Sequence, residues 1–256
     1  MKVCVLSSGS KGNSCLVYTN KTKILIDLGT TTQYICNELN KLNIKPSEID
    51  AILITHIHVD HIHGLKTFIR KYNPLIYVTE KLLGLLEEQV GQFRYEIYQD
   101  KQAIINDFRV NIIKTSHDAG EQIGFVIKNN DKSMVYITDT GYINSRYFDI
   151  LSNRNLYILE SYHDVLMLKN GPYPYFLQQR VLSDKGHLSN EQASSYLCKF
   201  IGKDTKTIVL AHLSEKNNSE EKALETLNNL LKENNIVFNN ILIARQNEPT
   251  EVIEVW

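Results

Sequence analysis

The chain contains 256 residues, of which 43% are hydrophobic and 22% are charged. This composition supports a sizeable buried core and excludes a chain that is disordered throughout. Because 28 Lys and Arg nearly balance 29 Asp and Glu, the net charge of −1 argues against a nucleic-acid-binding surface that is basic over the whole molecule, but it leaves room for a local basic groove.

Apolar runs bounded by turn residues predict the strands, and apolar residues at helical spacing predict the helices. In the first half of the chain we expect strands at residues 3–6, 15–18, 23–27 and 51–55, and helices at 31–42, 65–72 and 81–89. In the second half we expect strands at 108–114, 123–128, 134–138, 156–160, 207–210, 241–244 and 251–255, and helices at 190–200 and 220–233. Two successive sets of strands and helices predict two packed sheets with helices outside, an α/β fold.

No repeat, low-complexity tract or linker divides the sequence, so we expect residues 1–256 to form a single domain. No apolar stretch approaches the roughly 18 residues that cross a bilayer, and the apolar segment in residues 1–9 is too short for a signal peptide. The four cysteines (Cys4, Cys15, Cys36 and Cys198) form no C-x-x-C pair. We therefore expect free thiols in a cytoplasmic protein with no membrane partner.

The strongest chemical signal is the segment His56-Ile57-His58-Val59-Asp60-His61, directly after a predicted buried strand. Residues two apart in an extended segment project to the same side, so His56 and His58 can converge on one ion. A turn after them would direct Asp60 and His61 back to the same place. Imidazole and carboxylate ligands suit zinc, manganese or iron, so the segment predicts a metal site rather than a chance cluster in a solvated loop.

One segment rarely supplies all the ligands for two ions, so further ligands are expected at the ends of other strands. His117, Asp139 and His212 each follow a predicted strand. A single histidine in such a place is more often a hydrogen-bonded loop residue. Three such positions together with the anchor segment favour metal ligands.

The order of these residues resembles the metallo-β-lactamase-fold hydrolase superfamily, whose members carry a His-x-His-x-Asp-His signature followed by a His, an Asp and a His at later strand ends. The resemblance implies an αββα four-layer sandwich and two divalent metal ions (Zn, Mn or Fe). It also implies a ligand set: His56, His58 and His117 for one metal, Asp60, His61 and His212 for the second, and Asp139 bridging both. Asp27 resembles the early aspartate of the superfamily, which would fix the metal loop without binding metal.

Three segments resemble, more narrowly, the YycJ/WalJ group of bacterial exonucleases: residues 7–14, 160–164 and 186–190. This resemblance implies a phosphodiesterase, a DNA exonuclease directed to 5′ ends, in which a hydroxide bridging two metals attacks phosphorus. The Gly-His-Leu-Ser segment also resembles tRNA 3′-processing enzymes, where a histidine paired with a glutamate protonates the leaving oxygen. His187 would then be the general acid and Glu160 its orienting partner, with Asp60 completing the catalytic set. An ordinary histidine before a helix is the alternative for His187.

Weaker signals concern substrate contacts. Ser10 and Asn13 lie in a Gly- and Ser-rich loop that could cradle phosphate, although a tight hairpin turn explains the loop nearly as well. His163 could touch substrate or only precede a helix, and Arg180 could contact phosphate or be solvated. The aromatic residues Tyr173, Tyr175 and Phe176 could stack on bases, but a patch at the edge of the core is the commoner explanation.

Two other functions compete with the nuclease. A thioesterase or lactonase resembling glyoxalase II would use the same metals on a small substrate, and a binding protein would keep the metals for structure alone. The segments around Glu160 and His187 favour the phosphodiesterase. The sequence leaves open which metal binds, whether DNA or RNA is cut, the end polarity and the oligomeric state.

Overall fold

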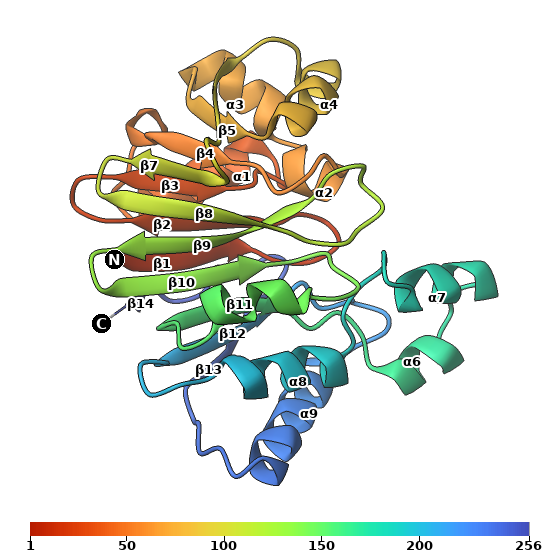
Figure 1. The fold of residues 1–256 in the computed structure, drawn as a ribbon. Helices are drawn as coiled ribbons and strands as arrows, with labels where there is room; N and C mark the ends of the chain where they lie inside the picture. Colours follow the sequence, from red (N-terminus) through yellow and green to blue (C-terminus); the bar gives the residue numbers. More distant parts are fainter. Residues whose placement is uncertain (256) are drawn as a thin grey trace.

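Two seven-stranded sheets pack face to face with helices on both outer sides in the computed structural model, which describes residues 1–255 (Figure 1). The first sheet has the order β14-β1-β2-β3-β4-β5-β6, and the second has the order β13-β12-β11-β10-β9-β8-β7. The α/β class and the αββα sandwich predicted from the sequence are therefore confirmed.

The strands of the first sheet are β1 (Lys2–Ser7), β2 (Ser14–Tyr18), β3 (Lys23–Ile26), β4 (Ala51–Leu53), β5 (Leu75–Val78), β6 (Arg94–Ile97) and β14 (Ile253–Glu254). Those of the second sheet are β7 (Gln102–Ile105), β8 (Phe108–Lys114), β9 (Ile123–Asn129), β10 (Lys132–Ile137), β11 (Leu156–Glu160), β12 (Thr207–Ala211) and β13 (Ile241–Ile243). Strands β3 to β6 run parallel, as do β10 to β13. Their carboxyl ends are therefore brought to the same edge of each sheet.

The helices are α1 (Thr32–Lys41), α2 (Val59–Ile62), α3 (Leu65–Tyr72), α4 (Glu80–Val90), α5 (Phe148–Leu151), α6 (Val165–Asn170), α7 (Tyr175–Leu182), α8 (Asn190–Phe200) and α9 (Glu220–Glu233), with 3₁₀ turns at Pro46–Glu48 and Ser145–Tyr147. Figure 1 shows α3 and α4 outside the first sheet, α8 and α9 outside the second, and α6 and α7 projecting beyond the sheets. Among residues 1–255 no helix has the length and the apolar content needed to cross a membrane.

The core forms because the central strands are apolar on both faces. In β1, Val3 and Val5 point into the layer between the sheets, and the alternating Leu6 packs toward the outer helices. Helix α1 meets that outer face with Ile35 and Leu39, four residues apart and both fully buried. Each such aliphatic side chain contributes about 1.5–3 kcal/mol when it leaves water.

The predicted elements with buried faces are present, several of them with the expected bounds, as for α3, β8, β11, α8 and α9. The turn expected after His58 takes the form of the short helix α2, which directs Asp60 and His61 to the same place. Strands β5, β6 and β7 and helices α5, α6 and α7 are absent from the prediction. Strand β6 is mostly exposed, so its sequence carries no apolar alternation, and the pair α6–α7 is interrupted by Gly171, Pro172 and Pro174.

Candidate metal centre

The candidate ligands lie where strands end. His56 follows β4, His117 follows β8, Asp139 follows β10 and His212 follows β12. Asp139 and His212, together with Asp27 after β3, adopt left-handed backbone angles with φ between 54° and 58°. Asp and His tolerate this region better than most residues, and strained strand ends of this kind cluster at functional sites.

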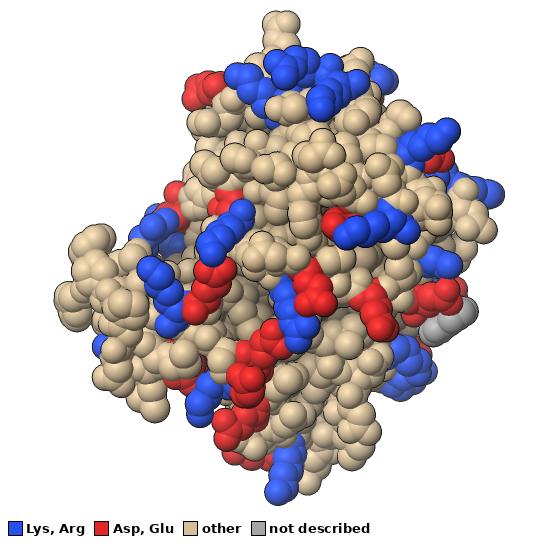
Figure 2. Space-filling model, turned by 180° about the vertical axis from the view of Figure 1, so that it is seen from behind, with Lys and Arg blue, Asp and Glu red and all other residues tan. Residues whose placement is uncertain are grey.

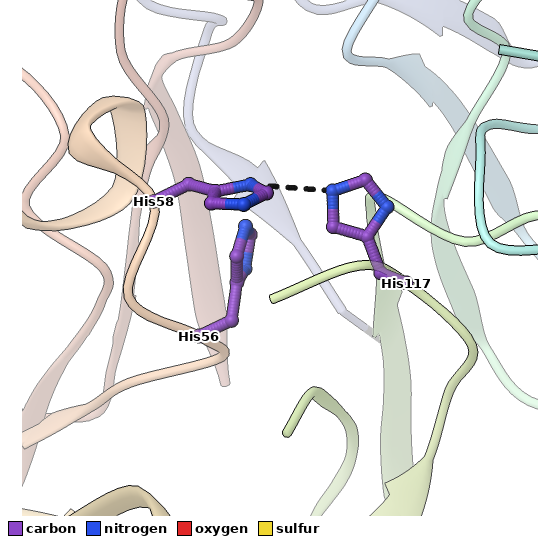
Figure 3. Close-up of side chains that lie close together, drawn as sticks. All are labelled: His56, His58 and His117. Carbon is purple, nitrogen blue, oxygen red and sulfur yellow. Dashed lines mark hydrogen bonds between the residues drawn. The ribbon is translucent and has the colours of Figure 1, made fainter. Parts of the chain in front are cut away.

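Three histidines form the first cluster, which Figure 3 shows with the rings facing one another: His56, His58 and His117. The Nε2 atom of His117 lies 3.3 Å from Nδ1 of His58. Nδ1 of His117 lies 3.1 Å from the Gly186 carbonyl and can donate to it, which leaves Nε2 free to bind a metal. Burial, reinforced by His61, lowers the pKa of His56 well below its usual value, so this ring is neutral, as a ligand must be.

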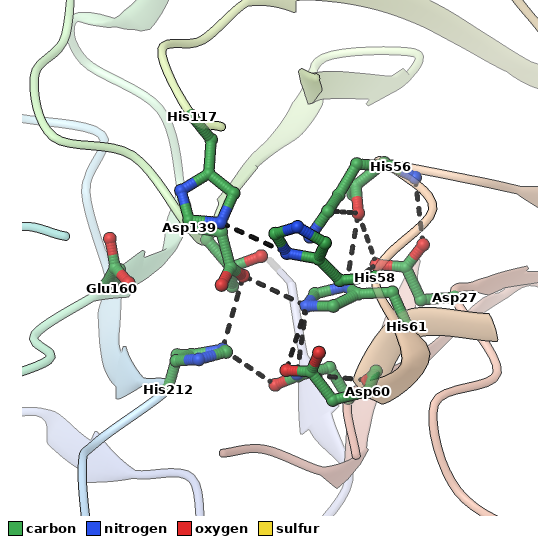
Figure 4. A network of polar contacts seen from close by, with 12 residues as sticks. Asp27, His56, His58, Asp60, His61, His117, Asp139, Glu160 and His212 are labelled. Atoms are coloured by element: carbon green, nitrogen blue, oxygen red, sulfur yellow. Dashed lines mark hydrogen bonds and ion pairs between the residues drawn. The ribbon is translucent and has the colours of Figure 1, made fainter. Parts of the chain in front are cut away.

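Asp60, His61, Asp139 and His212 form the second cluster (Figure 4). Oδ2 of Asp139 lies 3.0 Å from Nε2 of His61 and 3.3 Å from Nδ1 of His212. Burial disfavours the charged form of His61, but the carboxylates of Asp139, Asp27 and Asp60 outweigh it and hold the pKa of His61 well above its usual value. The seven side chains predicted as ligands are thus brought together in two adjoining groups.

The donor atoms fit divalent metal ions. Nε2 of His56 is buried and has no hydrogen-bond partner among the described residues, and Oδ2 of Asp139 is buried with the His61 and His212 rings at ion-pair distance. A buried polar atom without a partner costs about 1–3 kcal/mol, which a metal ion would offset. Imidazole nitrogens and carboxylate oxygens are ligands for zinc, manganese and iron alike.

A buried carboxylate orients the metal segment. Asp27 accepts hydrogen bonds from the backbone N–H of Thr55 at 2.9 Å, from the Thr55 hydroxyl at 2.8 Å and from Nδ1 of His61 at 2.7 Å. The Thr55 oxygen in turn lies 3.0 Å from Nδ1 of His56. Both rings therefore present Nε2 to the centre. The predicted supporting role of Asp27 agrees with this geometry, whereas Thr55 is absent from the prediction because a threonine at a strand end is an ordinary residue.

The loop from Ser8 to Asn13 behaves as a hairpin turn rather than as an open phosphate cradle. Its amides at Ser8, Gly9, Lys11, Gly12 and Asn13 already donate within the protein. The side chain of Asn13 is fully buried and contacts Asp60, His61 and His212, which differs from the expected substrate contact. Asn13 therefore positions ligands, while exposed Ser10 remains able to meet substrate.

Glu160 and His187 lie beside the second cluster, with Oε1 of Glu160 only 2.6 Å from Nδ1 of His187. The other Glu160 oxygen accepts from the backbone amides of Thr140 at 2.9 Å and Leu188 at 3.2 Å, which fixes the carboxyl group. Burial and the Asp139 charge raise the pKa of Glu160 to about 8, and burial lowers the pKa of His187. Burial thus favours a protonated Glu160 carboxyl group beside a neutral His187 ring over a Glu160 carboxylate beside a His187 cation.

Tyr162 covers one face of the His187 ring. The two rings stack with centroids 4.0 Å apart and an interplanar angle of 15°, and the Tyr162 hydroxyl lies 3.5 Å from Oγ of Ser10. Sequence reasoning missed this residue, because a tyrosine two positions after Glu160 gives no sign of the stacking. Aromatic stacking of this kind restrains the orientation of the His187 ring.

Two predicted substrate contacts are placed differently. His163 is 1% exposed, and neither of its ring nitrogens has a hydrogen-bond partner among the described residues. Arg180 lies on α7 and donates from Nε to Asp118 at 2.5 Å, and the other Asp118 oxygen lies 3.6 Å from Nε2 of His58. Arg180 is thus connected to the first histidine cluster by Asp118, a residue that the sequence analysis did not identify.

The three residues of the predicted aromatic patch, Tyr173, Tyr175 and Phe176, lie in two different environments. Tyr173 packs against a small cluster formed by Tyr162, Leu168 and Val181, as expected for the edge of a core. Tyr175 and Phe176 are instead 75% and 74% exposed at the start of α7. The structure therefore leaves both of these rings free for contacts outside the chain.

A glycine allows the metal segment to approach the Asn13 loop. A Cβ atom on Gly29 would lie 1.7 Å from the Asp60 carbonyl oxygen and 2.5 Å from the Asn13 amide nitrogen. We expect Gly29→Ala to lower the free energy of unfolding by about 3 kcal/mol, because backbone on both sides must move. Urea unfolding in the presence of a chelator measures this loss.

Gly84→Ala is the matched control for this prediction. A Cβ atom there would meet nothing within 4 Å, and Gly84 lies inside α4, so we expect stability to stay equal or to rise by up to about 1 kcal/mol. Equal stability of the Gly29→Ala variant and the unchanged protein would contradict the close approach.

Comparison with known proteins identifies a family and several relatives of this chain. A model of the metallo-beta-lactamase superfamily matches residues 8–212. The chain is 40% identical over 236 residues to the protein named exodeoxyribonuclease WalJ of Streptococcus pneumoniae serotype 2, covering 90% of this chain and 88% of that protein. It is 36% identical over 235 residues to exodeoxyribonuclease YycJ of Bacillus anthracis, with the same shares covered. The crystal structure of the metallo-beta-lactamase fold protein YhfI from Bacillus subtilis superposes with a TM-score of 0.72 at 15% identity, covering 97% of this chain and 98% of that one, a likeness of fold alone.

Proposed function

The chain belongs to the metallo-beta-lactamase superfamily, and on this basis we propose that it is a metal-dependent phosphodiesterase that degrades DNA from 5′ ends. Two relatives named exodeoxyribonucleases, 36–40% identical over nine-tenths of the chain, support the substrate class. Free cysteines support the expected cytoplasmic location, since thiols stay reduced there.

His56, His58 and His117 would hold one divalent ion, and Asp60, His61 and His212 a second, with Asp139 between them. A pair of such ions, when bound, activates water for attack and neutralises charge on the phosphoryl oxygens. Asp27 and Thr55 keep the Nε2 atoms of His56 and His61 directed at the centre. Zinc, manganese and iron remain the candidate ions.

The chain's own contribution to bond cleavage is a proton for the leaving oxygen. His187 would donate that proton from its Nε2 while Nδ1 takes up the proton of the Glu160 carboxyl group, which leaves a neutral His187 and a Glu160 carboxylate. Stacking on Tyr162 holds the ring next to Asp139 and His212. A sugar alkoxide is a poor leaving group, so this proton matters more for DNA than for an activated ester. Ser10 and Arg180 at the rim would contact the substrate strand.

The Glu160–His187 pair carries the proposal, because a small-molecule thioesterase built on the same metals has no need of a buried acid at this position. Turnover of three substrates by the metal-loaded protein tests it: 5′-labelled DNA, bis(p-nitrophenyl) phosphate and S-lactoylglutathione. We expect mononucleotides from DNA, slower cleavage of the phosphodiester, and no thioester hydrolysis. Thioester turnover without DNA cleavage would replace the nuclease by the glyoxalase II-like alternative.

A further inference from the structure

A basic face lies on α1 and α3, the two helices that flank the metal segment in the sequence. Together these helices carry four basic residues and one acidic residue: Lys41, Lys66, Arg70 and Lys71 against Glu38. Glu38 is buried, and its Oε1 lies 2.8 Å from Nζ of Lys41. In Figure 2 Lys and Arg side chains gather at the top of the molecule, over the part where Figure 1 places α3.

Three of these cations have no acidic partner. Lys66, Arg70 and Lys71 are exposed, and none of them forms an ion pair with another described residue. Some cations elsewhere on the surface are paired, as Lys114 is with Glu121 and Arg245 with Glu220, so what distinguishes this face is that three unpaired cations share one short helix. In a chain of net charge −1, such a face creates a local positive potential.

A pocket beside the metal segment adjoins the start of this face. The pocket has a volume of 480 Å³ and is lined by the metal-ligand candidate Asp60 and by Ser10, Lys11 and His63. Helix α2 ends at Ile62 and α3 begins at Leu65, and between them the backbone N–H of Gly64 donates to the Leu28 carbonyl. His63, which lines the pocket, therefore stands three residues before Lys66 in the first turn of α3. Lys66 and Arg70 are four residues apart and both exposed, so they share one side of α3 and span about 6 Å along it.

We propose that the pocket and the basic face of α3 hold the phosphate backbone of the DNA strand beyond the cleaved bond, an inference that rests on the proposed function. Regularly spaced phosphates match a row of unpaired Lys and Arg, whose contacts fix register without reading sequence. Neutral side chains border the row on α1, where Gln33 and Asn37 are exposed, so no described carboxylate of α1 or α3 faces the strand.

The combined variant Lys66→Gln, Arg70→Gln and Lys71→Gln tests this inference. For a 5′-labelled 30-nucleotide single strand we expect KM to rise about tenfold with kcat unchanged. The salt dependence of kcat/KM should flatten by about 2 in the slope of the log–log plot, since three phosphate contacts at about 0.7 each are lost. Turnover of bis(p-nitrophenyl) phosphate, which cannot reach α3, should stay within twofold.

A matched control removes three exposed lysines from other surfaces: Lys21→Gln, Lys203→Gln and Lys232→Gln. It changes the net charge equally, and we expect it to leave KM and the salt slope unchanged. An equal effect in both variants, or no effect in either, would overturn the inference while the nuclease activity of the native protein stands. A native protein that cleaves no phosphodiester at all would instead remove the proposed function.

An anionic membrane is the other surface that such a face could meet. Vesicles of phosphatidylglycerol serve as the probe, in competition with the labelled strand. If the native protein binds these vesicles through the three cations while the KM for DNA is unaffected by their loss, the face belongs to a membrane contact and the inference is wrong. We expect DNA to be bound in preference.

Discussion

Replacing Asp139 by alanine should remove metal and activity together. Its carboxylate belongs to the second cluster of metal-ligand candidates, and its buried Oδ2 lies between the rings of His61 and His212. Substitution also leaves His61 and His212 without the negative charge that lies about 3 Å from each ring. We expect the metal content to fall from two ions to at most one per chain. Phosphodiester turnover should fall more than 100-fold, beyond what is typical when a residue that only supports a ligand is lost.

Elemental analysis after dialysis measures the metal, and turnover of bis(p-nitrophenyl) phosphate measures activity on the same samples. Asp131→Ala is the matched control, because that aspartate is exposed in the turn between β9 and β10 and pairs only with Lys132. The control should keep both metal and activity. Two ions per chain in the Asp139→Ala variant would remove Asp139 from the ligand set.

Replacing His187 by alanine should leave the metals in place and abolish DNA cleavage. Its Nδ1 is engaged by Glu160 at 2.6 Å, and no other described histidine is both paired with a buried carboxylate and placed outside the predicted ligand set. Loss of a general acid costs about 10²–10⁴-fold in kcat. For bis(p-nitrophenyl) phosphate, whose leaving group is a weak base, we expect a far smaller loss.

The ratio of the two losses separates proton donation from a structural role. A variant that lost both activities equally, or that lost metal, would assign His187 to structure, and unchanged DNA turnover would remove it from the mechanism. Glu160→Gln should show the same pattern with a smaller loss, because an amide can still hold the ring but cannot share its proton. Single-turnover rates at saturating DNA isolate the chemical step from product release.

Most of the buried elements could be predicted because their apolar residues recur at the spacing that a helix or a buried strand requires. Strands β8 and β11 and helices α8 and α9 carry runs or stripes of apolar residues, and their expected bounds agree with the structure. The edge strands β6 and β7 could not be predicted, since their side chains are largely exposed and their stability comes from pairing with a neighbour. Strand β6 is identified only by its parallel pairing with β5, and β7 only by its hairpin pairing with β8.

The candidate ligands were accessible from the sequence for a local reason. Spacing within residues 56–61 and the position of each later histidine or aspartate after an apolar strand are features of short segments, and the topology of parallel strands brings such ends to one edge. Several supporting residues lacked any local sign of their role. Thr55, Asp118 and Tyr162 are ordinary residues until distant segments meet, and Asn13 was expected to contact substrate rather than ligands.

The sequence by itself therefore determined the layered fold, and it singled out the seven candidate ligands and the Glu160–His187 pair that the structure brings together. The tertiary structure alone decided what supports that pair, which aromatic rings stay exposed, and where an otherwise neutral chain is locally basic. The physical reason is that these features depend on contacts across long stretches of chain, such as the Ser8 hydroxyl that accepts from the backbone N–H of His212, 204 residues away. Local patterns carry hydrophobic periodicity, but they do not record which side chains and charges become neighbours once the sheets have formed.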